Sequence, residues 1–189
     1  MTRGLKLSSF GPATRQGGGA IPCPRTVRGA AIRPESGYGT QMDESPLTIE
    51  SLRELTDADA EAIASLLVQL SSSAAFDRAR TEAVIAHEAT ELLVARDSGR
   101  IVGTATLVTA PSLTGLRGHV EDVVVDEAAR GRGIARLLLE HMTQLARQRG
   151  LRTLDLTSRP SRESALRLYE SVGFHRRETN VLRFTPATD

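Results

Sequence analysis

The pattern of hydrophobic and polar residues divides the chain near residue 46, and only the longer second part shows the periods of regular secondary structure. Apolar residues recur at helical spacing in four segments, 56–70, 78–89, 134–149 and 161–172. Six shorter segments, 47–52, 91–96, 101–109, 119–125, 153–157 and 181–184, have the composition of strands. Because strands and helices interleave, the second part predicts an α/β domain with a mixed sheet and helices on both faces.

Local signals mark where some of these elements begin and how they are joined. Thr56 and Asp59 have the spacing of a capping box at the start of the first helix. Residues 97–99, Asp-Ser-Gly, have the composition of a hairpin turn between two strands. The strand at 119–125 carries four valines and is apolar on both faces, which is typical of a strand in the middle of a sheet.

Residues 1–45 are rich in Gly, Pro, Ser and Arg and show no hydrophobic period, so we expect them to be disordered. Up to Arg33 they hold six basic residues and no acidic one, a composition that an organelle transit peptide can have. A flexible tail, or a translation start placed upstream of a true start at Met42, explains the same composition. The organisation we expect is a disordered segment, 1–45, followed by a folded domain, 46–189.

Composition and charge narrow the functional classes. Of the 189 residues, 40% are hydrophobic and 25% are charged, which is ordinary for a soluble globular protein. No apolar run is long enough to cross a bilayer, and the formal net charge of +1 gives no reason to expect nucleic acid or a membrane surface as the partner. Cys23 is the only cysteine and cannot form an internal disulfide, so we expect a reducing, cytoplasmic environment.

The clearest chemical signal is the turn at residues 130–136, between the valine-rich strand and the next helix. Its two glycines, Gly131 and Gly133, carry no Cβ, so the backbone can turn tightly and approach a ligand closely. The helix that begins here presents unpaired N–H groups and the positive end of its dipole. Such a helix end suits a pyrophosphate, and three arginines add positive charge beside it: Arg130, Arg132 and Arg136.

Two other phosphate-binding motifs do not fit this turn. A Walker loop requires a lysine after its last glycine, and this turn has none. A dinucleotide fingerprint requires glycine or alanine where Arg136 stands, because that position packs closely against the strand. On this motif alone, an ordinary glycine turn with solvated arginines remains the alternative.

Two motifs together resemble the GNAT acyltransferase superfamily. Residues 130–135, Arg-Gly-Arg-Gly-Ile-Ala, are similar to its signature Q/R-x-x-G-x-G/A, which lies between a strand and a long helix as it does here. Residues 165–174, Ala-Leu-Arg-Leu-Tyr-Glu-Ser-Val-Gly-Phe, resemble its second signature, A-x-x-L-Y-E-x-x-G-F. The resemblance covers about residues 47–185. The chain departs from it at Arg162, where many members carry an asparagine that contacts the cofactor arm.

The resemblance implies a mostly antiparallel sheet of six to seven strands, and N-acetylation with acetyl-CoA as co-substrate. It implies that the backbone of 130–136 holds the pyrophosphate and that the main chain of Val123 and Val125 pairs with the pantetheine arm. Tyr169 would lie near the thioester sulfur, where its hydroxyl can stabilise or protonate the departing thiolate. The expected cofactor-binding set is Val123, Val124, Val125, Arg130, Gly131, Arg132, Gly133, Ile134, Ala135 and Arg136.

The attacking amine must be neutral, so a base is needed, directly or through a water molecule. Glu121 and Asp122 precede the valine run and would point to opposite faces of a regular strand, so only one of them can face the acceptor. His119 shares a face with Glu121 and is a third candidate. Segment 118–125 resembles the matching strand of glucosamine-phosphate N-acetyltransferases. The expected catalytic residues are Tyr169, Glu121 and Asp122, with the choice of base open.

Other mechanisms find no support in the sequence. The domain has no cysteine and no G-x-S-x-G motif for a covalent acyl-enzyme, and its histidines form no ligand motif, so we expect no metal. We therefore expect direct transfer of an acetyl group to a primary amine of a small molecule or peptide, in a ternary complex. A catalytically silent CoA-binding regulatory module, or a transferase for a longer acyl-CoA, is the alternative. Acceptor specificity is expected in loops 71–77 and 110–117, and the oligomeric state, monomer or homodimer, stays open.

Overall fold

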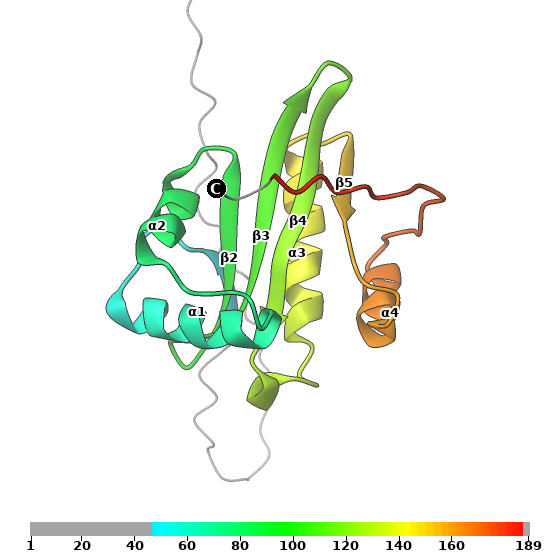
Figure 1. The fold of residues 1–189 in the computed structure, drawn as a ribbon. Coiled ribbons are helices and arrows are strands. Elements are labelled where there is room, and N and C mark those ends of the chain that lie inside the picture. The colour runs from blue at the N-terminus through cyan, green and yellow to red at the C-terminus, as the bar shows by residue number, and fades with distance from the viewer. Residues whose placement is uncertain (1–46, 187–189) are drawn as a thin grey trace, which may run out of the picture. The chain divides into compact units, whose positions relative to one another are not determined.

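The computed structural model of the protein describes residues 47–186, so the segment 1–45 that we expect to be disordered lies outside the described residues. Within them, one sheet has the strand order β1-β2-β3-β4-β5 (Figure 1). The strands are β1 (Thr48–Ser51), β2 (Thr90–Asp97), β3 (Arg100–Ser112), β4 (Gly115–Val125) and β5 (Thr153–Leu156). The helices are α1 (Asp57–Leu70), α2 (Arg78–Ala86), α3 (Ile134–Gln148) and α4 (Glu163–Ser171), with a 3-10 turn, η1 (Glu127–Ala129).

The sheet corrects two expectations. It is mixed rather than mostly antiparallel, because β5 runs parallel to β4 while β1 to β4 pair antiparallel. It has five strands among the described residues, not six to seven, and segment 181–184 is not a strand. Apolar composition favours a strand only where a partner strand and a buried face are available. This segment has neither within residues 47–186, and its large side chains are 76–91% exposed: Val181, Leu182 and Phe184.

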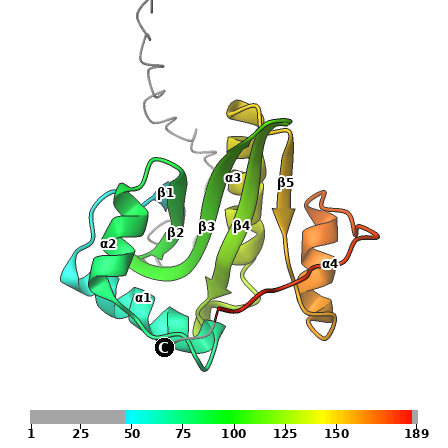
Figure 2. The ribbon, with the colours of Figure 1, turned by 45° about the horizontal axis from the view of Figure 1, so that its top comes forward.

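Two hydrophobic cores lie on opposite faces of the sheet, as the alternation along β2 shows. Leu93 and Ala95 pack toward α3 and α4, whereas Leu92 and Val94 pack toward α1 and α2. In Figures 1 and 2, α1 and α2 therefore cover the face of the sheet that is seen from the front, and α3 lies behind the sheet. Helices on both faces are thus confirmed, and burying each large aliphatic side chain contributes about 1.5–3 kcal/mol.

The predicted start of the first helix is confirmed. Thr56 Oγ1 accepts a hydrogen bond from the Asp59 N–H at 3.1 Å, and Asp59 Oδ2 accepts one from the Thr56 N–H at 3.4 Å, which completes the capping box. The second helix ends at Ala86, three residues before the predicted end at 89, and is capped by His87. Helix ends are the least certain part of such predictions because the last turn frays.

The expected acceptor loop at 110–117 is instead a β-hairpin. Ala110 pairs with Arg117 and Ser112 with Gly115, so β3 and β4 continue to the turn between them. Ser112 Oγ donates to the Gly115 carbonyl at 2.7 Å, and the φ angle of Gly115 is +123°. The proline, serine and glycine residues indicated a loop, but pairing between the strands on either side extends the hairpin through them.

Strands β4 and β5 pair along only part of their length, and a candidate ligand-binding edge follows where the pairing ends. They pair only from Arg117 opposite Thr153 to Val120 opposite Leu156. Beyond that point β5 ends and β4 continues to Val125, so the strands separate at their carboxyl ends. The main-chain groups of β4 that face β5 have no partner strand there among the described residues. A linear ligand could therefore pair with this edge as an extra strand would.

Candidate active site

A β-bulge at Asp122 shapes the middle of β4. Thr104 lies opposite Val124 and Thr106 opposite Glu121, so two β4 residues face one β3 residue between these pairs. Asp122 has a φ angle of +53°, rare for a residue other than glycine, and its carbonyl accepts a hydrogen bond from Thr104 Oγ1 at 3.2 Å. The bulge interrupts the regular alternation that would place Glu121 and Asp122 on opposite faces. Bulges of this kind redirect side chains beside active sites.

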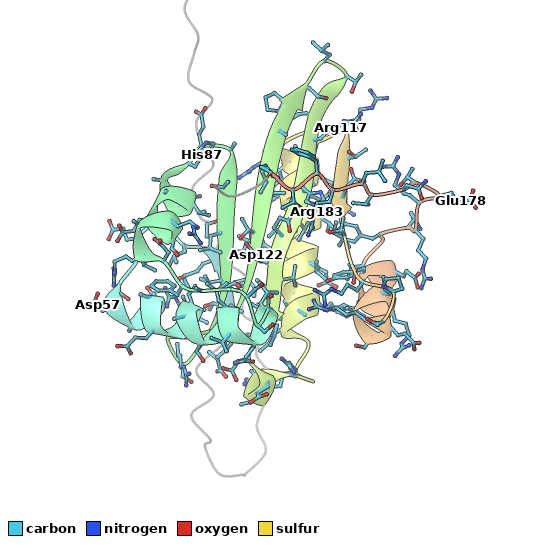
Figure 3. All side chains as sticks on the ribbon, in the orientation of Figure 1. Asp57, His87, Arg117, Asp122, Glu178 and Arg183 are labelled. Carbon is cyan, nitrogen blue, oxygen red and sulfur yellow. The ribbon has the colours of Figure 1, made fainter. Side chains whose placement is uncertain are left out.

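The three candidate bases lie close together in this part of β4. His119 Nε2 lies 3.2 Å from Glu121 Oε1, and their side chains are 37% and 52% exposed. Both point to the face that carries α1 and α2, because Glu121 pairs with Thr106 on that face. Asp122 is also accessible, and Figure 3 shows it near the middle of the sheet. Desolvation first, and the nearby Glu121 carboxylate second, raise the pKa of Asp122 and make it a stronger base than an ordinary aspartate.

The glycine turn before α3 has the predicted geometry. Gly131 and Gly133 have φ angles of +80° and +79°, which favour glycine over any other residue. Gly133 caps α3, and no side chain accepts from the first N–H groups of that helix. A Cβ added at either glycine would find no atom within 4 Å. The backbone donors at the positive end of the helix therefore face open space, as an anion site requires.

A pocket of about 190 Å³ lies at this turn. Its walls come from the end of β4, from the turn, from the first residues of α3 and from α4. The lining residues are Val125, Ala129, Arg130, Gly131, Gly133, Ile134, Ala135, Arg136 and Leu168. Of the ten residues predicted to bind the cofactor, seven line this pocket. Leu168 and Ala129 were not predicted, although Leu168 is the leucine of the second signature and could have been included on that ground.

The three arginines of the turn differ in their contacts. Arg130 donates from Nε to the Val125 carbonyl at 3.2 Å, and Arg136 donates to Ser171 Oγ of α4 at 2.9 Å. Both line the pocket. Arg132 lies outside the lining and forms an ion pair with Asp97 at 2.5 Å, at the turn between β2 and β3. The positive charge beside the pocket therefore comes from Arg130 and Arg136.

The valines of β4 hold their side chains in the cores. Val124 is 7% exposed and packs with α1, while Val123 and Val125 pack with the core that α3 covers. Of the three, only Val125 lines the pocket. A role of Val123 and Val124 in cofactor binding thus requires their main-chain groups at the open edge of β4, as the resemblance implies.

Tyr169 lies half-buried on the inner face of α4. Its ring packs edge-on against Phe174, with ring centroids 6.2 Å apart, and against the core under α3. Within residues 47–186 its hydroxyl has no hydrogen-bond partner. Burial raises the pKa of Tyr169, and the positive charge of Arg162 opposes that shift. The phenol therefore stays protonated at neutral pH, in the form that can donate a proton.

The described residues hold no group of histidine, cysteine, aspartate and glutamate side chains that could bind a metal ion. None of the helices among residues 47–186 is long and apolar enough to span a membrane.

Comparison with known proteins gives consistent matches. A family model described as "Acetyltransferase (GNAT) family" matches residues 50–174. A glucosamine 6-phosphate N-acetyltransferase from Trypanosoma brucei brucei is 37% identical over 95 residues, which are 49% of this chain and 63%, less than two thirds, of that protein. The N-alpha-acetyltransferase RimI of Mycobacterium tuberculosis is 35% identical over 140 residues, 71% of this chain and 82% of that protein. The crystal structure of a Trypanosoma brucei acetyltransferase matches with a TM-score of 0.62 and 28% identity, and covers 74% of this chain and 100% of that one.

Proposed function

Because the chain belongs to the GNAT acetyltransferase family, we propose that it moves an acetyl group from acetyl-CoA to a primary amine by direct transfer in a ternary complex. The observation that carries this proposal is the pocket at the glycine turn, where β4 and β5 separate. An extended acyl-CoA would run from the pocket along the open edge of β4 toward Tyr169.

The turn and its two arginines would bind the pyrophosphate. The N–H groups at the start of α3 point into the pocket region, and the helix dipole favours an anion there. Arg130 and Arg136 add charge-assisted hydrogen bonds, which are about twice as strong as neutral ones. Both side chains are already held by the protein, at Val125 and Ser171, so binding orders them further at little entropic cost.

The pantetheine arm would extend along β4. Among the described residues, β5 does not pair with Val123, Val124 or Val125, and the Val125 carbonyl accepts a hydrogen bond from Arg130 Nε. Two or three backbone hydrogen bonds would align the arm as an added strand, and the arm would carry the thioester from the pocket toward the bulge at Asp122. The acetyl group would then lie between the candidate bases and Tyr169.

The candidate bases would make the amine neutral. The pair formed by His119 and Glu121 can take a proton directly or through a water molecule, and the raised pKa of Asp122 gives that carboxylate the same capacity. Tyr169, protonated and without another partner for its hydroxyl within the described residues, would protonate the thiolate as it leaves. Acid and base would therefore come from different elements, α4 and β4.

The acceptor is a primary amine of a small molecule or a peptide. The names of two relatives indicate their acceptors, glucosamine 6-phosphate for one and an α-amino group for the other. A panel that contains glucosamine 6-phosphate, peptides with different first residues, amino acids and polyamines would discriminate between them. Faster thiol release with one member identifies the acceptor class, and acyl-CoAs of increasing chain length test the choice of acetyl. Binding of CoA without turnover of any amine would indicate a silent regulatory module instead.

Three further expectations stay predictions: a cytoplasmic location, the division of the chain near residue 46, and the absence of a nucleic-acid partner. The oligomeric state, monomer or homodimer, also stays open.

A further inference from the structure

The side chain of Arg162 connects the start of α4 to the end of α1, near the point where β4 and β5 separate. Arg162 precedes α4, just after the end of β5, and its side chain donates to the carbonyl of Leu70, the last residue of α1, at 3.4 Å. The neighbouring Gln69 accepts a hydrogen bond from the Glu127 N–H at 2.9 Å, which fixes the end of α1 beside the end of β4. The guanidinium therefore crosses from the β5 side to the β4 side where the strands separate.

Arg162 and Tyr169 lie on the same face of α4, two turns apart. The Leu166 N–H donates to the Arg162 carbonyl at 3.0 Å, so Arg162 is in register with the helix, and Tyr169 follows two turns later on the same face. Side chains of a helix lean toward its N-terminus, which directs the ring of Tyr169 back toward Arg162. The charge of Arg162 acts on the phenol and lowers its pKa against the effect of burial.

The charged side chains within α4 are neutralised by neighbours. Glu163 pairs with Arg167 at 3.5 Å, and Glu170 pairs with Arg176 at 2.7 Å. The bond from Arg162 to a neutral carbonyl is long for a hydrogen bond and lies at the surface, so it leaves the charge uncompensated and free to turn to a stronger acceptor. Arg162, at the N-cap of α4, is the charged residue that acts on Tyr169.

We propose that Arg162 is a catalytic residue whose positive charge faces the sulfur of bound CoA and stabilises the thiolate as the acetyl group leaves. The inference rests on the proposed function. As the amine nitrogen bonds to the carbonyl carbon, the carbon–sulfur bond breaks and its electron pair goes to sulfur. The base on β4 takes the amine proton, and Tyr169 gives its proton to the thiolate and regains one from solvent. Arg162 transfers no proton, because a guanidinium keeps its charge.

Binding alone can test this proposal, without any turnover. Calorimetry compares CoA with desulfo-CoA, which lacks the sulfur, from about pH 6.5 to about pH 9, the range in which a free thiol ionises. A facing positive charge lowers the pKa of the bound thiol, so the affinity for CoA relative to desulfo-CoA increases as the pH rises. With a shift of about one unit the ratio increases about tenfold and levels off above the pKa of the free thiol.

Three variants assign the effect to one side chain. In Arg162→Gln the increase with pH should disappear while desulfo-CoA affinity changes by no more than a few fold, and Arg162→Lys should restore part of it. Arg167→Gln, on the same helix but paired with Glu163, is the matched control and should behave as the native protein does. An affinity ratio that is flat in the native protein, or unchanged in Arg162→Gln, overturns the assignment. If neither CoA nor desulfo-CoA binds, the pyrophosphate site and the proposed function fail first, and the role of Arg162 falls with them.

Discussion

Replacing Gly133 with valine isolates the role of the glycine turn. The φ angle of Gly133 is +79°, a conformation that a β-branched residue adopts only under strain. A Cβ at this position meets no protein atom within 4 Å, so the free protein suffers backbone strain but no steric clash. The added side chain instead occupies the space at the start of α3 in which the pyrophosphate would lie.

The two effects have different magnitudes. Backbone strain in the left-handed region costs about 1–2 kcal/mol, which lowers the Tm of a domain of this size by about 3–8 °C. Charge-assisted hydrogen bonds contribute about 1.5–3 kcal/mol each, so losing two of them weakens CoA binding at least about a hundredfold. Affinity should therefore fall much more than stability.

Gly150 provides the matched control at the other end of α3. Its φ angle is +63°, and a Cβ there also meets no atom within 4 Å, but it lies outside the pocket. Gly150→Val should lose a similar amount of stability and bind CoA as the native protein does. Isothermal titration with CoA and thermal unfolding of both variants decide the matter. Native affinity in a folded Gly133→Val variant, or an equal loss in both variants, would refute the assignment of the site.

Four further outcomes are expected. Tyr169→Phe should lower kcat by about 10²–10⁴-fold with Kd and Tm nearly unchanged, and a native single-turnover rate would make the residue a packing residue only. If Asp122 is the base, kcat/KM rises with pH through a pKa above the ordinary 3.8, because only the carboxylate accepts a proton. Asp122→Asn should remove that rise of kcat/KM with pH. A rise that persists in the variant would instead point to Glu121 with His119 as the base. Arg136→Gln should weaken CoA binding more than Arg132→Gln at low salt, since only Arg136 lines the pocket; equal losses would contradict that difference. Removal of residues 1–41 should leave Tm and CoA affinity unchanged, and a large loss in either would move the domain boundary.

Much of the fold could be predicted because its signals are local. The capping box at Thr56, the helical face of α3 and the valines of β4 each depend on neighbours within a few residues. The errors occur where distant partners decide. The hairpin at 110–117 exists because two strands pair through a segment with loop composition, and 181–184 lacks the partner that its composition would need to form a strand.

In the candidate active site, too, local features could be predicted and features that depend on distant residues could not. The glycine turn was predictable because Gly131 and Gly133, which have no Cβ, can adopt the positive φ angles that such a turn needs. The bulge at Asp122 was not, since it arises from the register between β3 and β4 and has no glycine to mark it. The ion pair of Arg132 with Asp97 joins residues 35 positions apart, and no pattern within the turn distinguishes that arginine from Arg130.

Transfer of an isotope-labelled acetyl group from acetyl-CoA to an amine tests the central claim most directly. The account predicts that mass spectrometry finds the label on the acceptor amine, in an amount equal to the thiol released, and that both depend on the amine and on a folded Gly133 turn. It would be contradicted by a protein that binds CoA with native Tm but leaves every amine of the panel unlabelled, or that releases thiol without labelling any amine.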